Sequence, residues 1–277
     1  MDYVTVKVTR HEIGQQVASL GLNGEFVCLH ACPESFEHVD GGADTIIDTF
    51  LDAGCTIMVP TFSGAQLEVR PHPDQMIERN GWDATRAQSL PVQSDVVYSP
   101  DLDLVDESMG AISAAVLRRT ERCRGNHPHN SFTAVGPRAH LLVDDQAWDD
   151  VYAPLRELTK QRGYVLLSGV GLNRMTLLHF AEGLAGRRQF RRWATDSNGD
   201  AVPVSVRSCS EGFPNFEQTL GNLAQEATLG RSACRLFPAA ESVTASAALI
   251  RTEPGITHCG DPECVQCPHA IAGGPIL

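Results

Sequence analysis

Basic side chains are scarce in this chain. Lysine and arginine number 22 against 34 aspartates and glutamates, and the formal net charge is −12. Nucleic acid is not expected as a partner, because phosphate contacts need a basic face. An acidic cleft would instead attract and concentrate a cationic substrate. The alternative is that moderate acidity serves solubility alone.

Long apolar runs are absent as well. No run approaches the ~18 residues that a membrane helix needs, so no membrane partner is expected. The first ten residues, M-D-Y-V-T-V-K-V-T-R, lack the apolar core of a secretion signal, and the cytoplasm is the expected compartment. There is no internal repeat or low-complexity linker. The simplest organisation is a single domain over residues 1–277.

Nine cysteines are present, which is an odd number. Without a secretion signal they do not form the pattern of a disulfide scaffold. Most are expected to be small buried apolar side chains. Three of them cluster near the end of the chain, at Cys259, Cys264 and Cys267.

Apolar patterning predicts an α/β fold. A strand over Glu25–His30, an amphipathic helix over 43–53 and a strand over Cys55–Pro60 form a βαβ unit with parallel strands. Residues 64–107 are irregular and are expected to be a long insertion, of the kind that can act as a lid. Further helices are expected at 9–20, Met109–Arg119, Val151–Thr159, Asn215–Ala227 and Ala239–Leu249, and further strands at Tyr164–Ser168 and Val202–Val206. The predicted architecture is a layered α/β/α sandwich with a mixed, largely parallel central sheet.

The stretch from Gly163 to Glu182 holds the most informative pattern. A buried strand, a glycine turn and the start of a helix follow one another, and Thr176, His179 and Glu182 share one helix face. Ligands of open α/β sheets bind beyond the carboxyl ends of the strands, so a histidine with a carboxylate there is a candidate general base. A lone helical histidine is otherwise more often structural.

Several motifs agree in order and spacing with one family. These are His30-Ala31-Cys32 with Gly41, Gly42 and Met58-Val59-Pro60-Thr61; Met109-Gly110; His127-Pro128, Ser131 and Gly136-Pro137-Arg138-Ala139; Gly169-Val170-Gly171 with Thr176, His179, Ala181 and Glu182; and Arg191-Arg192-Trp193. Over roughly residues 10–269 the chain resembles the aminoglycoside 3-N-acetyltransferases, the antibiotic N-acetyltransferase family outside the GNAT fold. Its tail looks like that of the apramycin-acetylating branch.

The resemblance implies an acetyl-CoA-dependent enzyme that modifies the 3-amino group of the 2-deoxystreptamine ring of aminoglycoside antibiotics. It implies His179 as general base, Glu182 as its orienting carboxylate and His30 as a further catalytic residue. The implied cofactor contacts are Ala31, Cys32, Ser35, His127, Ser131 and Thr176. A direct transfer without an acyl-enzyme is expected, in a monomer or a homodimer.

The departures from the family pattern concern the substrate contacts more than the acetyl-CoA chemistry. Glu68, Glu211 and Glu241 are the candidate acceptor-binding acids, since a polycationic drug requires an acidic cleft. Three departures from the family pattern stand at Ala31, at Leu172 in the glycine turn and near Arg207, where an acidic residue is usual. Two alternatives therefore stay open, a non-catalytic aminoglycoside-binding protein and an acetyltransferase for another amine.

The tail over 256–277 has zinc-like ligand types. Cys264 and Cys267 form a C-x-x-C pair, with His258, Cys259 and His269 nearby. Cys209 or one of the histidines could complete a structural zinc site, and the expected ligand set is Cys209, His258, Cys264 and Cys267. Free thiols in a mobile tail are the alternative.

Overall fold

The computed structural model describes residues 7–82 and 84–277. Residues 1–6 and residue 83 lie outside the described residues. Residues 1–6 belong to the segment in which no secretion signal is expected, and residue 83 belongs to the expected insertion. Among the helices of the described ranges, none combines the length and apolarity needed to cross a membrane.

Seven strands form the central sheet, in the spatial order β4-β5-β2-β1-β6-β10-β9. Their bounds are β1 Phe26–Ala31, β2 Thr56–Pro60, β4 Cys123–Arg124, β5 Phe132–Val135, β6 Tyr164–Ser168, β9 Gln225–Leu229 and β10 Ser232–Pro238. The predicted βαβ unit is confirmed, since β1 pairs in parallel with β2, and β1 also pairs in parallel with β6. The other four pairings are antiparallel. The sheet is mixed, but the expectation that it is largely parallel is wrong, because antiparallel pairs form both of its edges.

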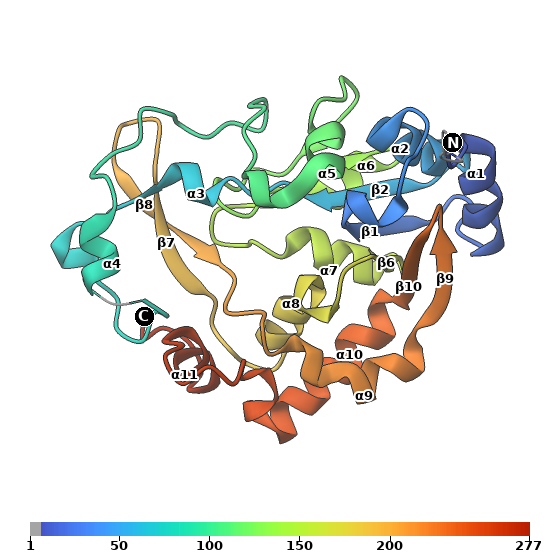
Figure 1. The fold of residues 1–277 in the computed structure, drawn as a ribbon. Helices are drawn as coiled ribbons and strands as arrows, with labels where there is room; N and C mark the ends of the chain where they lie inside the picture. The colour runs from blue at the N-terminus through green and yellow to red at the C-terminus, as the bar shows by residue number, and fades with distance from the viewer. Residues whose placement is uncertain (1–6, 83) are drawn as a thin grey trace, which may run out of the picture.

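Helices cover both faces of this sheet, with α1, α2 and α5 on one side and α7, α8 and α10 on the other (Figure 1). The helix bounds are α1 Arg10–Ser19, α2 Gly42–Asp52, α3 Gly64–Leu67, α4 Ala84–Ser89, α5 Gly110–Leu117, α6 Ala139–Val143, α7 Ala153–Lys160, α8 Leu177–Leu184, α9 Glu217–Leu220, α10 Ala239–Thr252 and α11 Gln266–Ile271. Successive side chains of a strand point to opposite faces. Accordingly Val27 and Leu29 of β1 join one core, while Phe26 and Cys28 join the other.

A second, antiparallel sheet holds the insertion in place. It contains β3 Glu68–Val69, β7 Phe190–Thr195 and β8 Ala201–Val206, in the order β3-β7-β8. The insertion over 64–107 supplies β3, which pairs with β7, and otherwise has short helices and irregular chain. Trp82 of the insertion stacks on Trp193 of β7, with ring centroids 5.5 Å apart. The insertion is therefore attached to the small sheet at β3 and at Trp82.

The helix expected over Asn215–Ala227 is wrong in its second half. α9 ends at Leu220, and the chain then forms β9 from Gln225 onward. β9 pairs antiparallel with β10 across a two-residue loop that begins with Gly230, whose φ is +61°. Tight hairpins of this kind favour glycine in the loop. Pairing with β10 overrides the local helical pattern, which is the usual way that tertiary contacts defeat propensity.

Candidate active site

A cleft of about 370 Å³ lies where β1, β2 and β6 end. His30 and Ala31 at the end of β1, Pro60 at the end of β2 and Gly169 just after β6 line it. Gly169 has a φ of +65°, and a Cβ there would collide with the side chain of Ser35. The cleft thus occupies the position that open α/β sheets use for ligands.

His179 and Glu182 form a hydrogen-bonded pair beside this cleft. His179 Nδ1 lies 2.9 Å from Glu182 Oε2, one turn apart on α8. His179 lines the cleft although only 3 % of the residue is exposed. With Nδ1 held by the carboxylate, Nε2 is the ring nitrogen left to accept a proton. The geometry predicted for this helix face is confirmed, while the catalytic role stays a prediction.

Two other side chains hold the carboxylate of Glu182. Arg187 Nη1 donates a hydrogen bond of 2.7 Å to Oε1, and the Ser208 hydroxyl donates one of 2.6 Å to Oε2. Burial works to raise the pKa of Glu182, but the bonds from His179 and Ser208 and the charge of Arg187 outweigh it, so this pKa lies below its usual value. Glu182 is therefore ionised and oriented at neutral pH.

The protonation state of His179 follows from its surroundings. Burial lowers the pKa of His179 and outweighs the opposite effect of Glu182, while the charge of Arg207 also lowers it. The imidazole is accordingly neutral at neutral pH and able to act as a base. Tyr152 stacks nearly parallel to the ring at 6.3 Å, and Phe213 lies tilted against it at 4.6 Å. These contacts fix the plane of the ring.

The residues of the first motif line the same cleft as His179. His30, Ala31 and Cys32 all line the cleft. Burial lowers the pKa of His30 to about 4, and the charge of Arg174 adds to the effect, so His30 is neutral. The Cys32 thiol donates to Glu34, 3.1 Å away. The Ser35 hydroxyl lies behind the wall, 2.6 Å from the carbonyl oxygen of Cys32.

The expected cofactor contacts outside the first motif separate into two places. Thr176 lines the cleft at the start of α8. His127 and Ser131 are completely buried. They line neither this cleft nor the second cavity that continues from it. His127 Nε2 lies 2.8 Å from the carbonyl oxygen of Ser205, and Ser131 Oγ accepts a hydrogen bond of 3.0 Å from Arg124 Nε. Their contacts are those of residues that fix a loop.

A second cavity of about 460 Å³ continues from the first. The two share Phe62, Ser108, Met109 and Arg207 in their linings. Its further walls include Glu68, Trp82 and Asp106. Together the two cavities form one groove from the strand ends to the small sheet.

The three candidate acceptor-binding acids differ in position. Glu68 lines the second cavity, where it pairs with Arg86 at 2.9 Å and with Arg192 at 3.3 Å. Glu211 lines the first cleft and accepts a hydrogen bond of 3.2 Å from Asn173 Nδ2. Glu241 lies on α10, outside both linings, and pairs with Arg162 at 3.1 Å.

The charge of the groove is mixed rather than acidic. The first cleft is lined by two acidic residues, Glu34 and Glu211, and by two basic residues, Arg174 and Arg207.

Ser208 was not identified from the sequence, although its hydroxyl contacts both members of the His179–Glu182 pair. Nothing in the local sequence S-C-S indicates that Ser208 belongs to the site. Its proximity to α8 depends on the route of the chain after β8.

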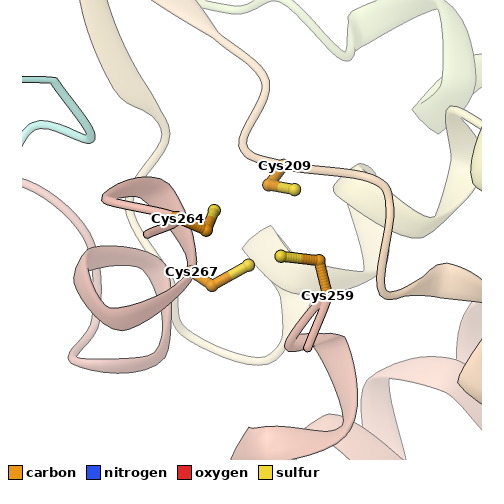
Figure 2. Close-up of side chains that lie close together, drawn as sticks. All are labelled: Cys209, Cys259, Cys264 and Cys267. Carbon is orange, nitrogen blue, oxygen red and sulfur yellow. The ribbon is translucent and has the colours of Figure 1, made fainter. Parts of the chain in front are cut away.

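The cysteine cluster differs from the predicted one in a single residue. The sulfurs of Cys209, Cys259, Cys264 and Cys267 lie within 4.8 Å of one another (Figure 2). His258 was expected in place of Cys259, but its Nδ1 accepts the backbone N–H of Gly260, 2.9 Å away. The four thiols could hold a metal ion.

Comparison with known proteins decides the family. The family model described as aminoglycoside 3-N-acetyltransferase matches residues 28–251. The chain belongs to the aminoglycoside 3-N-acetyltransferase family. It is thereby an acyltransferase of the class that acetylates amines with acetyl-CoA.

Two curated members of the aminoglycoside 3-N-acetyltransferase family illustrate the similarity. Aminoglycoside N(3)-acetyltransferase IX of Micromonospora chalcea is 37% identical over 191 residues, which cover 66% of the chain and 65% of that protein. The match thus spans just under two thirds of the Micromonospora protein. Aminoglycoside N(3)-acetyltransferase VIII of Streptomyces fradiae is 29% identical over 85% of the chain and 89% of its own length.

Solved structures of family members share the fold. A variant of aminoglycoside acetyltransferase AAC(3)-IVa in complex with gentamicin has a TM-score of 0.77 at 22% identity, covering 98% of the chain and 100% of its own. AAC-IIIb as a binary complex with CoASH has a TM-score of 0.70 at 20% identity, covering 89% of the chain and 97% of its own. At these identities the likeness establishes the architecture of the chain.

Proposed function

We propose that the protein transfers the acetyl group of acetyl-CoA to the 3-amino group of the 2-deoxystreptamine ring of an aminoglycoside, and so confers resistance to that antibiotic. The observation that carries this proposal is the buried His179–Glu182 pair beside a groove, in a chain of this family. Relatives bear the names of aminoglycoside N(3)-acetyltransferases, and one was solved with CoASH.

The chemistry is a direct displacement on the thioester. The acceptor amine attacks the acetyl carbonyl, and the C–N bond forms while Nε2 of neutral His179 takes the proton of the amine. Glu182 stabilises the imidazolium that results, and Arg187 and Ser208 keep the carboxylate in place. The tetrahedral intermediate collapses with cleavage of the C–S bond, and the proton passes to the thiolate of CoA. The hydroxyl of Thr176, which also lines the cleft, would donate to the oxyanion.

The two cavities suggest how the substrates are divided. The first cleft, with Ala31, Cys32 and Thr176, would take the pantetheine arm, and Ser35 would shape its wall from behind. The second cavity, with Glu68 and Asp106, offers carboxylates to an aminocyclitol. The two substrates would meet at the shared wall near Arg207. Because acetyl-CoA is a cytoplasmic metabolite, we place the reaction in the cytoplasm, in a monomer or a homodimer.

A thiol-release assay with acetyl-CoA tests the proposal. Gentamicin and apramycin are the acceptors to try first, the latter because of the resemblance of the tail to the apramycin-acetylating branch. We expect CoA thiol to appear only when an aminoglycoside is present. A His179→Ala variant should lose the activity, and an exposed-histidine control, His140→Ala, should keep it. A His179→Ala protein with full turnover would disprove the role of His179.

Two other functions give different results in the same experiments. A non-catalytic binding protein, which the departures at Ala31, Leu172 and Arg207 keep in view, would bind the drug in calorimetry without releasing thiol. An acetyltransferase for another amine would release thiol with a different member of an amine panel and not with the aminoglycosides.

A further inference from the structure

Four thiols from distant parts of the chain meet at one point. Cys209 lies in the connection after β8, whereas Cys259, Cys264 and Cys267 come from the last part of the chain, on either side of the start of α11. Their side chains point toward a common centre between the two segments (Figure 2). All four are free thiols in the structure. Cysteines that served only as small buried apolar side chains would not need to meet at one point.

The spacing of the sulfurs fits a tetrahedral ion. Zinc bound by four thiolates at ~2.3 Å places neighbouring sulfurs about 3.8 Å apart. The four sulfurs lie within 4.8 Å of one another, so shifts of side-chain torsions are enough to close the site. Four sulfur ligands in a closed arrangement are typical of structural zinc.

The backbone around the C-x-x-C pair supports the same conclusion. The backbone N–H of Cys264 donates to the carbonyl oxygen of Asp261, 3.2 Å away, and so forms a turn directly before the C-x-x-C pair. Gly260, with a φ of +83°, turns the chain between Cys259 and the C-x-x-C pair. These two turns bring Cys259 close to Cys264 and Cys267.

The location of the cluster connects it to the active site. Cys209 is flanked by Ser208, which donates to Glu182, and is followed by Ser210 and Glu211, which line the first cleft. The remaining three ligands belong to the C-terminal segment, which also holds Thr257, a hydrogen-bond acceptor for Arg187. An ion at this point would fasten both supports of Glu182 to each other.

We propose that Cys209, Cys259, Cys264 and Cys267 bind one zinc ion as thiolates, and that this ion fixes the chain segment 207–211 against the C-terminal segment. Binding releases the thiol protons to solvent. The ion takes no part in acetyl transfer. It holds Ser208, and through it the Glu182 carboxylate, in position. The inference does not depend on the identity of the acceptor.

Metal analysis is the direct test. The full chain, purified under reducing conditions, should contain one equivalent of zinc. Cys259→Ser should contain less than a fifth of that, and its neighbour control His258→Ala should keep the full equivalent. Refolding in the presence of cobalt should give the charge-transfer and d–d absorption of a tetrahedral tetrathiolate in the wild type and in His258→Ala. The cobalt spectrum does not depend on turnover, so it separates this inference from the proposed function.

Stability provides a second measurement. A chelator should lower the melting temperature of the wild type and of His258→Ala, and zinc should restore it, while Cys259→Ser should not respond to either. Thiol titration of unfolded, chelated protein should find all nine cysteines free. Protein that neither contains nor takes up zinc, that carries iron instead, or that titrates with fewer thiols because of disulfides would overturn the proposal.

Discussion

Replacement of Glu182 by glutamine tests the proposed catalytic role of the His179–Glu182 pair most sharply. The substitution keeps the size of the side chain and an oxygen for His179 Nδ1, and removes the negative charge. An imidazolium and a carboxylate about 4 Å apart attract each other by about 4 kcal/mol at an effective dielectric constant of about 20. Each 1.4 kcal/mol of lost stabilisation is a factor of ten, so we expect kcat to fall about 10³-fold in Glu182→Gln.

The same substitution also affects stability, because it leaves Arg187, which is 8 % exposed, without its ionic partner. Removal of one partner of a buried pair costs about 3–5 kcal/mol. The thiol-release assay must therefore be run below the measured melting temperature, with the KM for acetyl-CoA as an internal check. Glu157→Gln, which removes a carboxylate paired with Lys160 on α7, is the control. A folded Glu182→Gln enzyme with kcat within threefold of the wild type would refute the assigned role of the carboxylate.

Three further outcomes follow from the described geometry. Because burial lowers the pKa of His179, its imidazole stays neutral below its ordinary pKa, and the acid limb of kcat/KM against pH should have its midpoint below about 6.5; a midpoint above 7 would contradict this. Burial also lowers the pKa of His127 to about 4, so the stability that it contributes is complete above about pH 6.5 and is lost as the pH falls toward 4. In urea unfolding the wild type should lose about 2 kcal/mol more than His127→Asn between pH 7 and 5, because the other buried histidines, such as His30, titrate alike in both proteins. Finally, Gly169→Ala should cost about 2–5 kcal/mol from its left-handed backbone and its collision with Ser35, whereas Gly21→Ala, with a similar φ of +71° but open space, should cost only about 1–2 kcal/mol in thermal unfolding.

The central strands and the helix that carries His179 and Glu182 could be predicted from sequence because their signals are local. The apolar runs of β1, β2 and β6 are continuous, and the three-residue spacing of His179 and Glu182 requires only a helix. The hairpin of β9 and β10 could not be predicted in this way. Its stability comes from pairing with a partner strand, and its pattern of exposed residues resembles that of a helix surface.

Contacts between distant segments were the part that sequence patterns did not reveal. Ser208 reaches Glu182 only because the chain after β8 passes α8. Cys259, and not His258, lies beside the other thiols, because the side chain of His258 is bonded within the turn at Gly260. Glu241 shows the opposite error. Its charge suggested a place in the groove, but the register of α10 directs it to Arg162 on the surface.

The attachment of the insertion has a consequence for how substrates arrive. Glu68 joins Arg86 to Arg192 of β7, the guanidinium of Arg192 lies 4.5 Å over the Trp82 ring, and that ring stacks on Trp193. Movement of this segment away from the small sheet would break all of these contacts together. Glu68, Trp82 and Arg86 of the insertion thus form a wall of the second cavity that is already held in place before any ligand enters. Acceptors would then be selected by whether their ring substituents fit a rigid opening, and their association rates would follow diffusion and charge, with no slow closing step afterwards.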